Sequence, residues 1–159
     1  MSTDAGAAAL RRNLLAADIS ERTGIDEALI ERVVRSFYGR VARHEVLGPI
    51  FATRIDDWEA HIRRMCDFWS SVALMSGRYH GQPLVAHFGL PIEAHHFDQW
   101  LALFAETLAE LCRPEAAHHF LERAYRIAAS LELGIAAREG RALPPRTRRQ
   151  PLPGGDRPS

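Results

Sequence analysis

The segment DWEAHIRRMCDFWSSVAL, from Asp57 to Leu74, repeats apolar and aromatic side chains every three or four residues. This spacing gathers side chains on one stripe of an α-helix, whereas a half-buried strand would alternate with a period of two. The stripe contains Trp58, His61, Ile62, Met65, Phe68, Trp69 and Val72. The segment is therefore predicted to be a helix that buries this stripe, with one histidine among its apolar residues.

Three more segments show the same helical period. One runs from Asp26, a candidate N-cap, to His44. Another runs from Glu93 to Cys112, and the last starts at Pro114, a favourable first residue of a helix. No segment alternates over the length of a strand. We therefore expect an all-α fold.

The two ends of the chain differ from this helical body. Residues 1–24 are expected to form an N-terminal extension with a short helix around Asn13–Ala17, and residues 25–138 are expected to form the domain. Residues 139–159 are rich in Arg and Pro and have no apolar period, which is typical of a disordered tail. A solubilising role for this tail is simpler than contact with an anionic partner.

The composition excludes several classes of protein. Twenty Arg and no Lys balance twenty Asp and Glu, so the chain lacks the surplus of positive charge that nucleic-acid and anionic-membrane binders carry. No apolar stretch approaches the roughly 20 residues of a membrane span. The two cysteines, Cys66 and Cys112, are too few for a thiolate metal site, and we interpret them as free thiols in a reducing cytoplasm.

An irregular segment, GRYHGQPLVAHFGLP, occupies residues 77–91. Its three Gly and two Pro forbid a long helix, yet Leu84, Val85 and Phe88 are apolar and are expected to pack against something. A short helical turn at this place would aim the imidazole of His87 inward.

Four side chains introduce polar groups into the predicted core. Tyr38, His61 and Trp100 lie on stripes that would be wholly apolar if they served packing alone, and His87 lies among apolar neighbours. An unpartnered polar group in the interior costs about 1–3 kcal/mol. Singly, each of the four could be a core residue with an ordinary partner. Together, they fit one pocket between helices.

A pocket with a histidine on one side and three donors on the other has the arrangement that a haem requires. Its predicted walls include Phe37, Phe51, Met65, Phe68 and Trp69. One imidazole nitrogen fills an axial position of the iron, and the opposite position stays open for a diatomic ligand. Donors on the open side would stabilise the negative charge that dioxygen takes up when it binds.

Five segments follow one another with characteristic spacing: FYGRV (37–41), LGPIF (47–51), DWEAHIRRMCDFW (57–69), GRYHGQPLVAH (77–87) and HFDQWLALF (96–104). They resemble the truncated haemoglobins, and specifically the third group, the P-type, over Ile25 to Ala137. Groups one and two of that family usually carry Gly-Gly pairs near helix junctions, whereas the pair here, Gly154-Gly155, lies in the tail. The resemblance implies a two-over-two helical sandwich of globin type that binds haem b.

The resemblance also implies roles for individual residues. His87 matches the proximal ligand of the haem iron. The matching residues on the distal side, beside a bound ligand, are Tyr38, His61 and Trp100. The matching or neighbouring apolar residues against the haem are Phe51, Met65 and Phe68.

The charged and titratable residues outside these walls indicate a function less specifically. Arg64 and Arg54 are candidates to pair with the haem propionates, because a guanidinium forms charge-assisted contacts with carboxylates. Both could equally be solvated charges on helix faces. The histidines predicted to lie on the surface or in loops are His44, His80, His118 and His119.

Two classes of function follow from the resemblance. The chain would hold dioxygen, carbon monoxide or a related ligand at a five-coordinate iron, or it would act as an enzyme on nitric oxide or peroxide there. Three donors hint at reaction, because strongly held dioxygen leaves slowly. An unidentified reductase would keep the iron ferrous. The alternative is a haem-free helical interaction module, in which the buried donors pair only with one another.

Overall fold

The computed structural model describes residues 2–141, which contain helices and connections but no strand. The helices are α1 (Ser2–Thr23), α2 (Glu27–Arg43), α3 (Leu47–Ala52), α4 (Trp58–Leu74), α5 (Pro83–His87), α6 (Ala94–Leu111) and α7 (Pro114–Arg138). None of them combines the length and the apolar composition that crossing a membrane requires. The all-α prediction is confirmed. The predicted tail lies outside the described residues from position 142 onward.

Side-chain caps explain where two of the long helices begin. The carboxylate of Asp26 accepts a hydrogen bond from the backbone N–H of Leu29 at 2.8 Å, and that of Asp57 accepts one from Ala60 at 3.1 Å. Each bond satisfies one of the N–H groups that a first helical turn leaves unpaired. α7 begins with Pro114, which has no N–H to satisfy.

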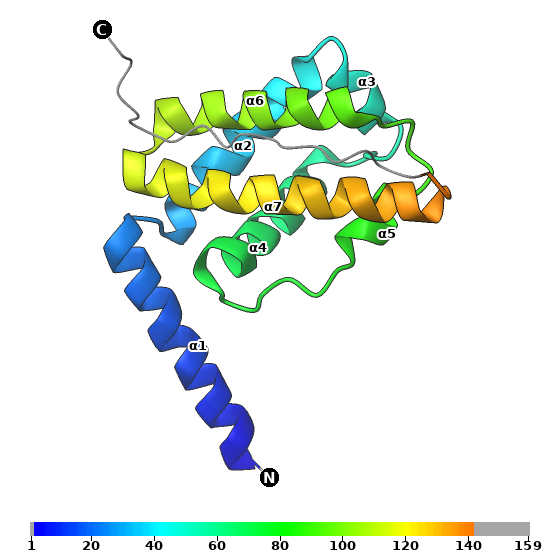
Figure 1. The fold of residues 1–159 in the computed structure, drawn as a ribbon. Coiled ribbons are helices and arrows are strands. Elements are labelled where there is room, and N and C mark those ends of the chain that lie inside the picture. The colour runs from blue at the N-terminus through cyan, green and yellow to red at the C-terminus, as the bar shows by residue number, and fades with distance from the viewer. Residues whose placement is uncertain (1, 142–159) are drawn as a thin grey trace, which may run out of the picture.

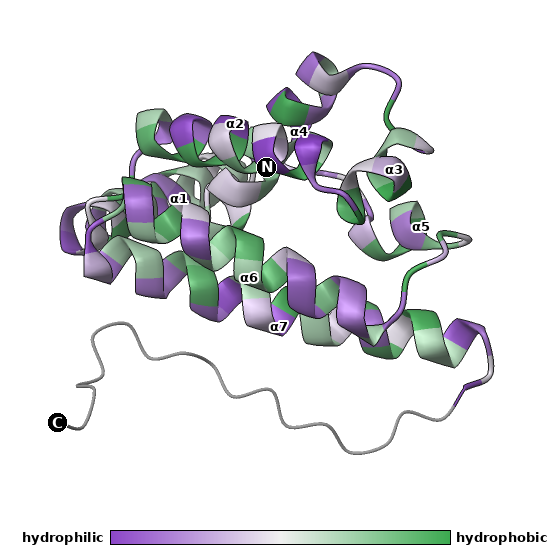
Figure 2. Ribbon diagram, turned by 90° about the horizontal axis from the view of Figure 1, so that it is seen from above, coloured by the Kyte–Doolittle hydropathy of each residue, from purple (hydrophilic) through white to green (hydrophobic). Residues whose placement is uncertain are grey.

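Two pairs of helices form the layers of the domain. α6 and α7 run side by side, connected by a short link, and α2 and α4 lie behind them in Figure 1. α2 packs against both α4 and α6. Hydrophilic and hydrophobic residues alternate along the four long helices of the sandwich in Figure 2, which is the pattern of helices with one buried side. The predicted two-over-two sandwich is confirmed.

Aromatic side chains fill the core where the layers meet. The largest fully buried ones are Phe37, Trp69, Phe104 and Phe120, one from each of the four long helices of the sandwich. The rings of Trp69 and Phe104 stack with 5.0 Å between centroids, and Phe120 meets Trp69 edge to face at 5.8 Å. Offset and edge-to-face pairs are the favoured aromatic arrangements, so this cluster fixes how α4 lies against α6 and α7.

The short helix α3 is an element that helical periodicity did not reveal. It sits close to the end of α2, because a Cβ atom added at Gly48 would lie only 2.8 Å from the carbonyl oxygen of Ala42. Glycine permits this approach, and the following turn then brings Phe51 within 6.0 Å of the Tyr38 ring, measured between centroids.

The N-terminal helix is much longer than the short helix predicted around Asn13–Ala17. α1 spans 22 residues and projects from the sandwich, which it contacts through its C-terminal half (Figure 1). Ile19 is buried there, whereas Leu14 is 63% exposed. The prediction was too short because residues 2–23 are rich in Ala, Leu and Arg, which favour helix without forming an apolar stripe.

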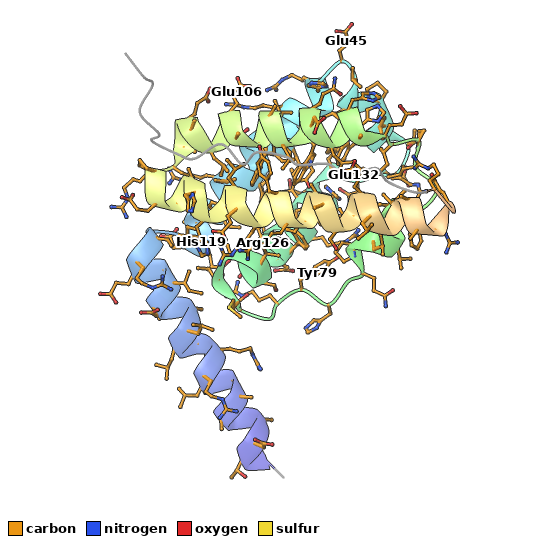
Figure 3. The ribbon with its side chains drawn as sticks, viewed as in Figure 1. Glu45, Tyr79, Glu106, His119, Arg126 and Glu132 are labelled. Atoms are coloured by element: carbon orange, nitrogen blue, oxygen red, sulfur yellow. The ribbon has the colours of Figure 1, made fainter. Side chains whose placement is uncertain are left out.

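His119, predicted to lie on the surface or in a loop, is a half-buried residue of α7 (Figure 3). Its Nε2 atom donates to the carbonyl oxygen of Ala73 at 2.8 Å, and Arg123 donates to that of Val72 at 3.2 Å. These carbonyls belong to the last turn of α4, where helical partners are missing. The surface prediction for His119 is therefore wrong: its side chain ties α7 to the end of α4.

Candidate functional site

A cavity of about 510 Å³ is lined by side chains from α2 to α7. Of the residues predicted for the site, all but Phe37 lie in its lining: Tyr38, Phe51, Arg54, His61, Arg64, Met65, Phe68, Trp69, His87 and Trp100. The size falls within the range of about 300–1,000 Å³ that is usual for pockets that bind small molecules and cofactors. Six helices and the connections between α3 and α6 thus bring residues from distant parts of the sequence to one place.

The histidine of α5 has one ring nitrogen fixed by the backbone. The Nδ1 atom of His87 lies 2.6 Å from the carbonyl oxygen of Pro83, one helical turn earlier. A carbonyl oxygen only accepts, so Nδ1 is a protonated nitrogen, and Nε2 is the nitrogen that carries the lone pair in the neutral ring. A backbone acceptor at the far nitrogen is the usual way in which proteins orient a histidine that binds a metal.

Arg54 holds the same segment from the side of α3. Its guanidinium donates to the carbonyl oxygen of Phe88 at 2.6 Å and to that of Ala86 at 3.4 Å. These two residues flank His87. The sequence predicts that Arg54 either contacts a haem propionate or is a solvated charge. The geometry adds a third role, which is to hold the end of α5 in place.

Tyr38, His61 and Trp100 meet at the opposite part of the cavity. The rings of Tyr38 and His61 are almost perpendicular, with centroids 4.8 Å apart. Trp100 stacks on Phe104 at 5.6 Å and meets the edge of Phe37 at 5.5 Å. Phe37 is not in the cavity lining, contrary to the prediction: it lies in the core behind it and supports Trp100.

Burial determines the protonation of His61 and Tyr38. The Nε2 atom of His61 is buried and has no hydrogen-bond partner among the described residues. Burial, aided by the positive charge of Arg64 and by His87, lowers the pKa of His61 to about 4. Burial also raises the pKa of Tyr38 above its ordinary value. Near neutral pH the imidazole of His61 and the phenol of Tyr38 are therefore both neutral.

The lowered pKa of His61 predicts a specific loss of stability in acid. Above its ordinary pKa of 6.5 the imidazole is neutral in both the folded and the unfolded chain. As the pH falls from 6.5 towards 4, the unfolded chain binds a proton that the folded chain does not, so the free energy of unfolding decreases. Below about 4, this contribution no longer changes.

Urea unfolding of the ligand-free protein, followed at both ends of this window, measures the effect. His61→Phe keeps a ring in the site and removes the titration, so it is expected to lose less stability than the wild type between the two pH values. An equal loss in both proteins would mean that His61 titrates alike in the folded and unfolded states.

Several lining residues were not identified from the sequence. Tyr79 lies in the α4–α5 connection, with its ring 5.2 Å from that of Phe68 (Figure 3). His96 lines the cavity at the start of α6, where its Nδ1 accepts from the backbone N–H of Glu93 at 2.8 Å. α7 contributes Ile127, Ala128 and Leu131. The apolar stripe of α7 predicted burial, but periodicity does not distinguish a cavity wall from a packed core.

Comparison with known families identifies the fold. A family model described as bacterial-like globin matches residues 18–131. The chain belongs to the bacterial-like globin family. This globin is 34% identical to Group 3 truncated hemoglobin ctb of Campylobacter jejuni over 113 residues, which cover 68% of this chain and 89% of that protein. It is 27% identical to Group 2 truncated hemoglobin YjbI of Bacillus subtilis over 86 residues, which cover 53% of this chain and 65% of that protein.

A solved structure supports the same assignment. The crystal structure of group III truncated hemoglobin from Campylobacter jejuni matches this globin with a TM-score of 0.66 and 33% sequence identity. The match covers 70% of this chain and 91% of the other. The resemblance to the third group of truncated haemoglobins is therefore confirmed.

A globin family implies a haem, and the cavity residues fit one. His87 offers its Nε2 atom, since its Nδ1 donates to the carbonyl oxygen of Pro83. The buried Nε2 atom of His61 has no hydrogen-bond partner within residues 2–141, and a ligand would provide one. The walls between them are largely apolar and aromatic, with Phe51, Met65 and Phe68 among them. The donor set and the walls are those that a haem with one protein ligand needs.

Proposed function

We propose that this globin holds haem b in its cavity, with Nε2 of His87 as the protein ligand of the iron, and binds dioxygen and related diatomic ligands beside Tyr38, His61 and Trp100. The haem iron supplies the open coordination site at which such ligands bind. One observation carries the proposal most strongly: the unpartnered Nε2 atom of His61 is buried in the same cavity that His87 lines.

On the proximal side, the protein orients the imidazole of His87. Its hydrogen bond to Pro83 fixes the tautomer, and the Arg54 contacts hold the carbonyl groups on both sides of it. A hydrogen bond to Nδ1 also raises the basicity of Nε2, which strengthens its bond to a metal. These contacts come from the protein itself and restrict the imidazole to one orientation.

On the distal side, the protein offers donors in a water-poor site. Tyr38 is 5% exposed and keeps its proton, because burial raises the pKa of its hydroxyl. Its hydroxyl, the indole N–H of Trp100 and the imidazole of His61 would stabilise a ligand that carries partial negative charge. The packing of Trp100 on Phe104 and Phe37 keeps the indole in place.

Titration of the purified haem-free protein with haemin tests the proposal. We expect saturable binding with one haem per chain and an absorption spectrum that changes on reduction and again on addition of carbon monoxide. A haem-free interaction module predicts no saturable binding. The unpartnered Nε2 atom of His61 argues against that alternative, in which the buried donors would satisfy one another.

The donor set also favours chemistry with nitric oxide or peroxide over dioxygen delivery. Three donors around one ligand slow its departure, and a long-lived complex has time to react. A reductase would then be needed to return the iron to the ferrous state. Stopped-flow mixing of the dioxygen-loaded protein with nitric oxide tests this: conversion to the ferric form faster than dioxygen dissociates supports it, and slower conversion contradicts it.

We also propose a cytoplasmic location. Cys66 and Cys112 are both free, which suits a reducing compartment. Burial raises the pKa of Cys112 to about 11 and also raises that of Cys66, so neither thiol is poised to react.

Replacing Arg64 by Ala is expected to loosen the haem modestly, and more at low salt than at high salt. Arg64 lines the cavity, is exposed, and forms no ion pair within residues 2–141. An exposed pair with a haem propionate would contribute about 0–1 kcal/mol and would be screened by ions. Haem transfer to an acceptor protein measures the rate. Equal rates in wild type and variant at both salt concentrations would mean that Arg64 is only solvated.

A further inference from the structure

α5 is too short to stand alone. It has five residues, none of them buried, and yet it carries His87. A single helical turn is not stable in water, because its nucleation costs more than its few hydrogen bonds contribute. The position of His87 therefore depends on what α5 packs against, and its main neighbour is the C-terminal part of α7 (Figure 1).

The contact with α7 is made at a glycine. Gly134 lies inside α7, where glycine is less favourable than alanine because of the backbone entropy that it loses. A Cβ atom added there would lie 2.7 and 2.8 Å from the two Cδ atoms of Leu84 and 3.3 Å from its Cγ. The Leu84 side chain thus occupies the place where any other residue at position 134 would have its own side chain.

A rotation about χ2 of Leu84 would relieve only part of this overlap. Turning χ2 moves the Cδ atoms but leaves Cγ at 3.3 Å, already closer than ordinary van der Waals contact. Leu84 would have to shift by a few tenths of an ångström or turn about χ1, and either change alters how α5 packs against α7. Leu84 precedes His87 by three residues, so it lies one helical turn below the imidazole.

We propose that Gly134 is a positioning residue for His87: the bare backbone at this point of α7 receives Leu84 and so sets how close α5, and the imidazole that it carries, lies to α7. This inference rests on the proposed role of His87 as the haem ligand.

A second contact with α7 lies on the other side of His87. The guanidinium carbon of Arg138 is 4.3 Å from the centroid of the Phe88 ring. Such cation–π contacts are attractive even at partly exposed sites. α5 is therefore held against α7 by Leu84 before the histidine and by Phe88 after it, and the Gly134 contact is the tighter of the two.

The test is Gly134→Ala, with Gly39→Ala as the matched control. Gly39 also lies inside a long helix, but a Cβ atom added there would meet nothing within 4 Å. For Gly134→Ala we expect faster amide hydrogen exchange in residues 83–88 of the haem-free protein. In the haem-loaded protein we expect a shifted iron–histidine stretching band and haem loss about tenfold faster, which corresponds to about 1.4 kcal/mol. Gly39→Ala should leave all three unchanged.

The double variant Gly134→Ala/Leu84→Ala separates positioning from simple destabilisation. Removing the Leu84 branch makes room for the new methyl group, so the double variant should have an iron–histidine band and a haem loss rate closer to wild type than Gly134→Ala alone. An interaction of this kind between two contacting residues is what a double-mutant cycle detects.

The outcomes also separate this inference from the proposed function. If the wild type binds no haem, or if His87→Ala leaves haem binding unchanged, the proposed function fails. In that case the amide hydrogen exchange of residues 83–88 still decides whether Gly134 positions α5. If haem binds through His87 but Gly134→Ala behaves like Gly39→Ala, or the double variant is no better than Gly134→Ala, then the role of Gly134 is refuted.

Discussion

Replacing His87 by Ala is expected to raise the haem dissociation rate by about a hundredfold or more. Loss of a partner that merely orients a metal-binding histidine typically costs 10–100-fold in metal affinity, so loss of the ligand itself should reach or exceed the upper end of that range. The side chain lines the cavity, with Nδ1 held by Pro83 and Nε2 free of that contact. Haem transfer to an acceptor protein and the spectrum of the ferrous form both measure the effect.

A control and a rescue make this prediction specific. His80 lies exposed in the α4–α5 connection. His80→Ala should therefore leave the haem dissociation rate within about twofold of wild type, as expected for a surface substitution. In His87→Gly, added imidazole should enter the vacated space and restore the wild-type ferrous spectrum. An unchanged spectrum and haem affinity in His87→Ala would show that another group is the axial ligand.

The second large effect is expected at the distal donors. Tyr38→Phe and Trp100→Phe each remove one donor and keep most of the ring packing. A hydrogen bond in a buried site contributes on the order of 1–2 kcal/mol, so each variant should release dioxygen roughly 5- to 30-fold faster than wild type. The double variant should exceed either single one, but by less than the product of the two, because both donors act on one acceptor.

Stopped-flow measurement of dioxygen dissociation tests this prediction. Tyr125→Phe is a suitable control, since it makes the same chemical change on α7 at a residue outside the cavity lining. Wild-type rates in both single variants and in the double variant would mean that these donors do not face the ligand.

The helical layers and the members of the site could be predicted from the sequence. Long amphipathic stripes fix which face of a helix is buried, and polar residues on such stripes, like Tyr38 and His61, are conspicuous because burying them without partners is costly. The resemblance to truncated haemoglobins then assigned a role to each. Their assembly around one cavity follows from the packing of the stripes.

Other features depend on contacts that a sequence does not display. Arg54 donates to carbonyl groups 32 and 34 residues away, and His119 donates to one 46 residues away. Nothing in their local sequence distinguishes them from solvated side chains. Gly134 appears as a weak point in a helix until its distance to Leu84 is known. α1 has strong intrinsic helix propensity but no buried stripe, so periodicity underestimates its length.

The central claim, that the cavity holds a haem through His87 and leaves the opposite side open, is tested most directly by absorption spectroscopy of the purified protein in its ferric, ferrous and carbon monoxide forms. The proposal predicts bound haem whose ferrous spectrum is that of a five-coordinate iron with one imidazole and changes fully when carbon monoxide is added. A protein that stays colourless after incubation with haemin, or whose ferrous spectrum does not respond to carbon monoxide, would contradict it.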